Sequence, residues 1–314
     1  MTSHDLPAQQ HLATLRWLLL SPPLVVAPSA LPVGAPRAQT PLAVFTPSQR
    51  DSIALWLEEL AQGSQLLTRW LQARPQARIG RYAEDLLEFY LTHGPQHRLA
   101  AAHVPLRSEV NGAVVTHGEL DFLLTDAQGQ RSHWELAVKF FLCTATGDTA
   151  TPVDFIGPNG VENLAHKWHK LFAKQLTHLP PAPWDAHSWQ PQAFTRGWMF
   201  YRWGSAVPRC DALHAQHCKG WWVDWASMAQ LPEGQYVYLP RLQWMAPVAS
   251  LGQLGLGSVV AARSEMQDYL ATQWASTQRR HDAQMVVLMS GSNEAAVEVR
   301  RFFICPSVAV GLIG

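Results

Sequence analysis

Apolar and polar residues alternate with a period of two in the segment Gly118–Phe140, and this alternation predicts a β-hairpin. The apolar positions of its two arms are Leu120, Phe122 and Leu124, followed by Trp134, Leu136, Val138 and Phe140. Asp126, Gln128 and Gly129 lie between the arms and are residue types that favour turns. We therefore expect two antiparallel strands joined by a short turn.

Three charged residues, Asp121, Glu135 and Lys139, interrupt this apolar pattern. Because side chains two residues apart share a face of a strand, Glu135, Ala137 and Lys139 are expected to point the same way. Carboxylates that lie among apolar strand residues are costly to bury unless they are paired or bind a cation. The charges therefore mark a candidate site. The alternative is an edge hairpin with one solvated face and a surface ion pair.

The spacing of apolar residues elsewhere predicts an α/β protein, in which residues 78–203 run helix, three strands, helix, strand. The predicted helices are Ala8–Leu20, Thr46–Gln62, Ser64–Ala73, Arg78–Thr92, Val161–His178 and Val259–Ser276. The predicted strands are Arg98–Glu109, Ala113–Thr125, Arg131–Cys143, Thr195–Trp203, Gly220–Asp224, Gln235–Leu239, Gln284–Met289 and Glu298–Cys305. The Pro- and Ala-rich segment Ser21–Pro47 is expected to form an irregular arm.

The composition narrows the function classes. The chain has 314 residues, of which 47% are hydrophobic and 15% charged, so it can build a large core as one domain or two. Its formal net charge is +0, so a nucleic-acid partner would need a local basic surface. Four scattered cysteines favour a reducing cytoplasm over a disulfide framework. The run Leu15–Val26 is too short to span a bilayer, so no membrane partner is expected; the oligomeric state is left open.

A helix glutamate, an aspartate in the second strand, and a glutamate with a lysine in the third strand resemble the PD-(D/E)XK nuclease superfamily. The residues in this chain are Glu84, Asp121, Glu135 and Lys139. More narrowly, the chain resembles DUF1853, a bacterial family of unknown function that is placed in that superfamily. The segments that carry the narrower resemblance are Arg16–Pro23, Ile79–Phe89, Gly118–Leu124, Trp134–Leu142, Gly157–Asn159 and Lys167–Leu176.

The resemblance implies a restriction-endonuclease-like core over residues 78–205. A helical N-terminal extension, residues 1–77, is expected to pack on that core. Residues 206–314 are expected to form an α+β addition within the same domain.

The implied activity is cleavage of phosphodiester bonds in DNA or RNA with the help of Mg²⁺ or Mn²⁺. A hard cation that prefers carboxylate oxygens can polarise a phosphoryl oxygen and lower the pKa of an attacking water. Asp121 and Glu135 are the expected metal ligands, with Glu84 adding a further contact. Lys139 and Gln175 are the other expected catalytic residues. The basic stripe Lys167, Lys170 and Lys174 is expected to contact phosphates of the nucleic acid.

One position departs from the superfamily pattern, which places a lysine two residues after the glutamate of the third strand. That position is Ala137 here, and the lysine is two residues further on, at Lys139. Two other functions therefore stay open. One is a catalytically inert nuclease-fold module that binds nucleic acid or protein. The other is a structural protein in which Glu135 and Lys139 form an ion pair.

Overall fold

The computed structural model describes residues 2–27, 42–63, 65–185, 187–255, 257–276 and 282–306. The predicted irregular arm Ser21–Pro47 lies partly outside these residues. Ser64, the predicted start of a helix, also lies outside the described residues. In the described part of the chain, no helix is both long enough and apolar enough to cross a membrane.

The described strands form one mixed sheet in the order β1-β2-β3-β5-β6-β10-β9-β7-β8, with the short strand β4 beside β3. Their bounds are β1 His97–Val110, β2 Ala113–Asp126, β3 Arg131–Cys143, β4 Phe155–Ile156, β5 Gln190–Arg202, β6 Cys218–Asp224, β7 Gln235–Leu239, β8 Val259–Ala262, β9 Gln284–Ser290 and β10 Val297–Cys305. The first three strands are antiparallel neighbours, whereas β5 runs parallel to β3 and β6 runs parallel to β5. The C-terminal strands continue the same sheet through β10, which pairs with β6.

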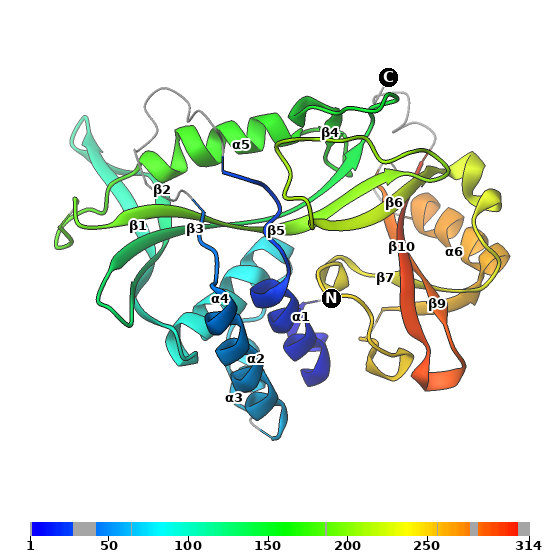
Figure 1. Cartoon of the computed structure of the whole chain (residues 1–314), viewed down its shortest axis with the longest axis horizontal. Coiled ribbons are helices and arrows are strands. Elements are labelled where there is room, and N and C mark those ends of the chain that lie inside the picture. The colour runs from blue at the N-terminus through cyan, green and yellow to red at the C-terminus, as the bar shows by residue number, and fades with distance from the viewer. Residues whose placement is uncertain are drawn as a thin grey trace.

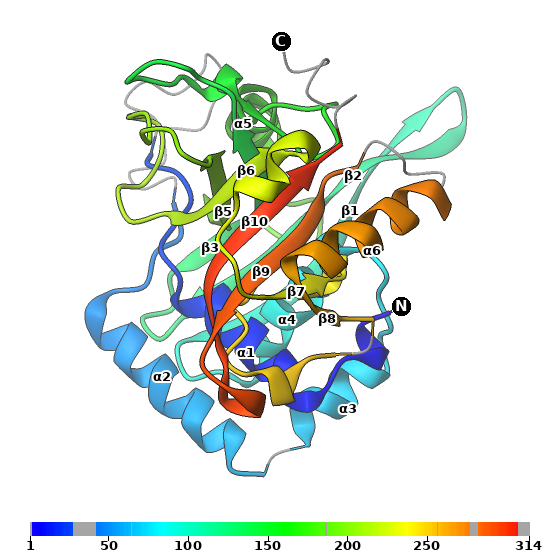
Figure 2. The same cartoon turned by 90° about the vertical axis from the view of Figure 1, so that its right-hand side faces the viewer.

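Helices cover both faces of the sheet (Figure 1). Their bounds are α1 Ala8–Leu20, α2 Pro47–Ala61, α3 Leu66–Gln72, α4 Ile79–His93, α5 Leu164–Ala173 and α6 Arg263–Ser276. Helices α1–α4 share one core with Phe122 and Trp134, and α5 packs on the opposite face against Phe141 and Met199. Helix α6 lies over the C-terminal strands, as Figure 2 shows. The structure thus confirms the predicted α/β class and the order helix, three strands, helix, strand.

Two predicted helices were wrong in extent. The segment Val259–Ser276 is divided into strand β8 and helix α6, because its β-branched start, Val259 and Val260, pairs with the edge of β7. The helix predicted over Val161–His178 begins only at Leu164, where the Asn163 side chain accepts a hydrogen bond from the His166 N–H. It ends at Ala173 and is followed by a 3₁₀ turn, Gln175–Thr177.

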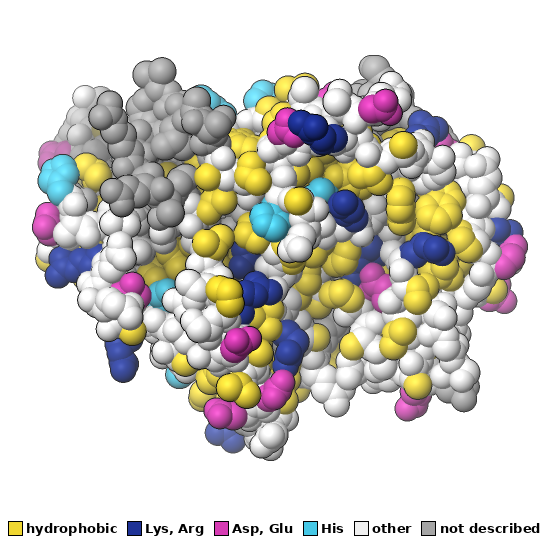
Figure 3. All heavy atoms as spheres, in the orientation of Figure 1, with side chains coloured by type: hydrophobic (Ala, Val, Ile, Leu, Met, Phe, Trp, Pro, Cys, Tyr) yellow, Lys and Arg dark blue, Asp and Glu magenta, His cyan; other side chains and the backbone are white. Residues whose placement is uncertain are grey.

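Charges on the surface are mixed. Figure 3 shows acidic and basic side chains interspersed over the visible face, without one large area of a single sign. This distribution agrees with the formal net charge of +0. Any attraction for a polyanion must therefore come from a local group of cations.

A buried arginine joins the sheet to the N-terminal helices. Arg196, in β5, is 1% exposed, and its Nε and Nη2 donate to the carbonyls of Leu18 and Leu19 at 2.8 and 3.3 Å. These carbonyls lie in the last turn of α1, where helix C-termini leave acceptors unpaired and favour positive charge. Burial lowers the pKa of Arg196 to about 9. The guanidinium thus fixes the end of α1 on β5.

We expect Arg196→Met to lower the free energy of unfolding by about 2–3 kcal/mol, because two buried carbonyls lose their donors. Arg202→Met is the matched control, since Arg202 ends the same strand but is 52% exposed; we expect it to change stability by less than about 0.5 kcal/mol. Urea denaturation measures both. Equal stability of the two variants would show that Arg196 does not support the contact between α1 and the sheet.

Candidate functional site

Strands β2 and β3 separate where the two predicted carboxylates lie. The ladder between them runs from Thr125–Arg131 to Phe122–Trp134 and stops there. Beyond that point the Oδ2 atom of Asp121 accepts a hydrogen bond from the Leu136 N–H at 2.8 Å. The N–H of Asp121 in turn donates to Oε1 of Glu135 at 3.4 Å. Side-chain carboxylates therefore replace the backbone ladder, and the structure brings Asp121 and Glu135 together as expected.

Glu135 is fully buried, and both of its oxygens have partners. Oε1 lies 2.7 Å from Nε2 of His133, and Oε2 accepts a hydrogen bond from the amide of Gln175 at 2.6 Å. His133 is 1% exposed, and its Nδ1 has no partner among the described residues. Nε2 is therefore best assigned as the protonated nitrogen that donates to Glu135. His133 was not predicted as a site residue, although its position two residues before Glu135 places it on the same strand face.

Gln175 reaches Glu135 from the other side of the site. It is the first residue of the 3₁₀ turn after α5, not part of a regular helix as predicted. Helix α5 packs over β3 and β5 through Leu171 and Phe172, which are buried beside Phe141. This packing holds the turn above β3, so the Gln175 amide orients the Glu135 carboxylate.

The Asp121 carboxyl has a strongly shifted pKa. Burial raises it most, the neighbouring Glu135 carboxylate raises it further, and the Leu136 N–H opposes the shift, with a result of about 8. Glu84 and Glu119 add smaller contributions in the same direction. The site therefore binds a proton more tightly than a free carboxyl does, and it would be stabilised by any other cation.

Glu84 belongs to a neighbouring group, not to the hydrogen-bonded pair. Its carboxylate accepts a hydrogen bond from Arg81 at 2.6 Å, and Arg81 also binds Glu119. One potential ligand atom each from Glu84, His103 and Glu119 lies within 4.8 Å of the others. His103 has a left-handed φ of +52°, and its Nδ1 lies 3.9 Å from Oε2 of Glu84. Glu84 was predicted to contact the Asp121–Glu135 pair. In the structure it acts on the pair only through its negative charge, which contributes to the raised pKa of Asp121.

Lys139 lies on the strand face of Glu135, as strand parity predicts, but its ammonium forms no ion pair with any residue that the structure describes. The β3–β5 ladder is continuous through Ala137, so no bulge shifts Lys139 toward the carboxylates. Gly197 stands opposite Lys139, and a Cβ there would lie 1.9 Å from the Lys139 carbonyl oxygen, so only glycine permits this close strand pairing. The lysine is therefore held at its own register position.

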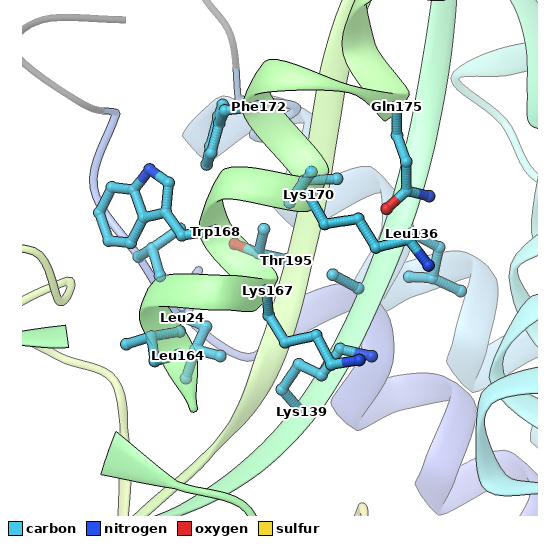
Figure 4. A pocket seen from close by; sticks show the side chains of 13 residues that line it. Leu24, Leu136, Lys139, Leu164, Lys167, Trp168, Lys170, Phe172, Gln175 and Thr195 are labelled. Atoms are coloured by element: carbon cyan, nitrogen blue, oxygen red, sulfur yellow. The ribbon is translucent and has the colours of Figure 1, made fainter. Parts of the chain in front are cut away.

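The Lys139 side chain points into a cavity of about 170 Å³ between α5 and the sheet (Figure 4). Lys167, Lys170 and Gln175 line the same cavity. Burial lowers the pKa of Lys139, and the positive charge of Lys167 lowers it further. Two of the three lysines of the predicted basic stripe, Lys167 and Lys170, thus line the cavity with Lys139. Lys170 and Lys174 are both exposed, but Lys174 does not line the cavity.

The shifted carboxyl gives a prediction for pH and stability. In the unfolded chain Asp121 takes its ordinary pKa of 3.8, whereas in the folded protein the value is about 8. Between these values the folded state binds more protons, so stability falls as the pH rises from about 4 to about 8. We expect Asp121→Asn to remove this loss and to raise the free energy of unfolding at pH 8 by on the order of 2–4 kcal/mol, with little effect at pH 4.

Urea denaturation without added metal, at pH 4, 6 and 8, measures this difference. Glu109→Gln, an exposed substitution near the tip of the β1–β2 hairpin, is the control and should leave stability unchanged at each pH. A difference between wild type and Asp121→Asn that does not grow with pH would contradict the electrostatic account.

Comparison with known proteins gives the family. A family model described as a domain of unknown function, DUF1853, matches residues 13–305. Neither a curated protein nor a solved structure matches the chain. Since the family model covers most of the chain, the protein belongs to the DUF1853 family.

Proposed function

We propose that the protein is a metal-dependent nuclease of the PD-(D/E)XK type, which cleaves phosphodiester bonds of nucleic acid at the Asp121–Glu135 pair. The observation that carries this proposal is the burial of two carboxylates side by side where β2 and β3 separate, next to a cavity lined by lysines. A structural ion pair would place the lysine on the carboxylates, yet Lys139 points into the cavity instead.

The arrangement of the central elements also supports this function. One helix, α4, precedes three antiparallel strands; α5 then crosses over the opposite face and leads to β5, which runs parallel to β3. This is the order of elements that the resemblance to restriction-endonuclease-like proteins implies. The carboxylates and Lys139 lie on the second and third strands of this unit, where the superfamily has its site.

The residues present fit a Mg²⁺ or Mn²⁺ ion. The donors are hard carboxylate oxygens, and burial together with the neighbouring Glu135 carboxylate raises the pKa of Asp121 to about 8, so a bound cation would relieve the repulsion between the two carboxylates. Asp121 and Glu135 would hold the ion, and Glu84 would add negative charge from α4. When bound, the ion would supply the Lewis acid that polarises a phosphoryl oxygen and lowers the pKa of water.

The protein's own groups would position the substrate and balance its charge. Gln175 and His133 fix the orientation of the Glu135 carboxylate through the hydrogen bonds described above. Lys139 would place a positive charge beside the reacting phosphate and stabilise the charge that develops there. Lys167 and Lys170 would bind phosphate oxygens at the cavity.

A second function is a catalytically inert module that binds nucleic acid through the same lysines. The observation in its favour is that Lys139 forms no ion pair or hydrogen bond with Asp121 or Glu135 among the described residues, while Arg81 already neutralises Glu84 and Glu119. Such a module would bind with the same dependence on salt but would not cleave.

Metal binding is tested first by thermal melting. We expect millimolar Mn²⁺ to raise the melting temperature of the wild type by about 2–5 °C, because the ion relieves repulsion in the folded state alone. Asp121→Asn should lose this response, and the exposed control Glu109→Gln should keep it. Equal responses of wild type and Asp121→Asn would place the Mn²⁺ elsewhere on the protein.

Catalysis is tested with single- and double-stranded DNA and RNA in the presence of Mg²⁺ or Mn²⁺. We expect cleavage by the wild type and none by Asp121→Asn. Lys139→Ala should lower kcat at least about tenfold while KM changes less than about threefold, since a group that stabilises developing charge acts mainly in the transition state.

Binding of nucleic acid without cleavage, under every metal condition, would instead establish the inert module. A Lys139→Ala variant that cleaves at the rate of the wild type would remove Lys139 from the reaction.

A further inference from the structure

The lysine cavity lies beside the carboxylate pair, but neither Asp121 nor Glu135 lines it. Lys139 enters it from β3, whereas Lys167 and Lys170 enter from α5, and Figure 4 shows these side chains directed to the same space. Within the described residues, the one ion pair of these lysines joins Lys167 to Glu162. The cavity thus holds more positive than negative charge.

These cations disfavour one another in the absence of a ligand. Lys139 loses hydration on burial, and the charges of Lys167 and Lys170 add repulsion that Glu162 only partly offsets. An anion among the three ammonium groups would relieve both effects. Three cations suit a phosphate monoester better than an internal phosphodiester, because the monoester carries a charge of about −1.5 to −2 and the diester about −1.

A buried hydroxyl in the same lining supports an anionic ligand independently. Thr195, on β5, is 3% exposed, lines the cavity, and its Oγ1 has no hydrogen-bond partner among the described residues. Leaving a buried hydroxyl without a partner is unfavourable, so most such groups have one. A phosphate oxygen would accept this hydrogen bond once the side chains that cover the hydroxyl move aside.

The walls of the cavity limit what can enter. Leu164, Trp168 and Phe172 line it from α5, and Leu24 and Val25 line it from the segment after α1, where the Leu24 N–H donates to the Thr195 carbonyl. Its volume of about 170 Å³ is below the ~300–1,000 Å³ of pockets that enclose a whole small molecule. A terminal group fits this space better than a continuous polynucleotide backbone.

We propose that this cavity binds a phosphate monoester, namely the terminal phosphate of a nucleic-acid strand, through Lys167, Lys170 and the Thr195 hydroxyl. The proposal rests on the proposed nuclease function for the identity of the ligand. Leu136, Ala137 and Gln175 line the cavity next to the carboxylates, so a strand anchored here by its end would present a nearby phosphodiester to Asp121 and Glu135. The protein would then act at strand ends.

Binding is tested with inorganic phosphate and no metal, by isothermal titration calorimetry. We expect the wild type to bind phosphate, Lys170→Ala to bind at least tenfold more weakly, and Thr195→Val to bind severalfold more weakly. Thr195→Val removes only an unpartnered hydroxyl and should melt no lower than the wild type, which separates lost binding from lost folding.

Lys174→Ala is the matched control, because Lys174 follows the same helix but does not line the cavity. We expect its affinity for phosphate to stay within twofold of the wild type. Absence of phosphate binding, or equal weakening by Lys174→Ala and Lys170→Ala, would overturn the proposal, since either result leaves only a general basic surface.

The source of the phosphate is tested with oligonucleotides that carry a 5′-phosphate, a 3′-phosphate or no terminal phosphate, and with closed circular DNA. We expect at least tenfold tighter binding of one phosphorylated end, lost in Lys170→Ala. Binding of inorganic phosphate without any preference for phosphorylated ends would overturn the assignment to strand ends in favour of a free phosphate compound.

The same substrates keep the two proposals distinguishable. Cleavage of circular DNA as fast as of phosphorylated linear DNA would overturn the anchoring role and leave the nuclease function intact. A preference for phosphorylated ends without cleavage in Mg²⁺ or Mn²⁺ would support the anchoring site and remove the nuclease function.

Discussion

Two carboxylates share one buried space between β2 and β3, and the surrounding elements supply the donors that make this arrangement tolerable. Asp121 takes a backbone N–H of β3, and Glu135 takes the ring of His133 and the amide of Gln175. Each donor depends on a larger feature of the fold, such as the end of the β2–β3 ladder or the 3₁₀ turn after α5. These donors do not fully compensate for burial and for the neighbouring Glu135 carboxylate, which raise the pKa of Asp121 to about 8.

Positive charge is present nearby but is kept apart from the carboxylates. Lys139 extends along the same strand face as Glu135, and its ammonium lies with Lys167 and Lys170 in the cavity under α5. Direct neutralisation would produce a closed ion pair, which offers no place for a ligand. In the proposed function, a cation at the carboxylates and a phosphate at the lysines would together relieve these separated excesses of negative and positive charge.

Much of this arrangement could be predicted from the sequence, because strand parity and helical spacing are local properties. From them one could predict that Glu135 and Lys139 share one face of their strand, and in which order the central helices and strands follow one another. The buried cation Arg196 was missed, because its partners are backbone carbonyls of α1 that leave no mark in the residue pattern. The contact of His133 with Glu135, the left-handed His103 and the separation of Lys139 from the carboxylates depend on side-chain packing and register between distant segments, which a local pattern does not contain.

The central claim is that Asp121 and Glu135 form a cation site, and anomalous X-ray scattering from crystals grown with Mn²⁺ tests it most directly. We predict one strong anomalous peak at the Asp121–Glu135 pair, with the Gln175 amide still bound to Glu135. A peak within the Glu84, His103 and Glu119 group alone would contradict the claim. The claim would also be contradicted if the Asp121–Glu135 pair held no Mn²⁺ at concentrations where the metal binds the protein in solution. The buried carboxylates would then be structural.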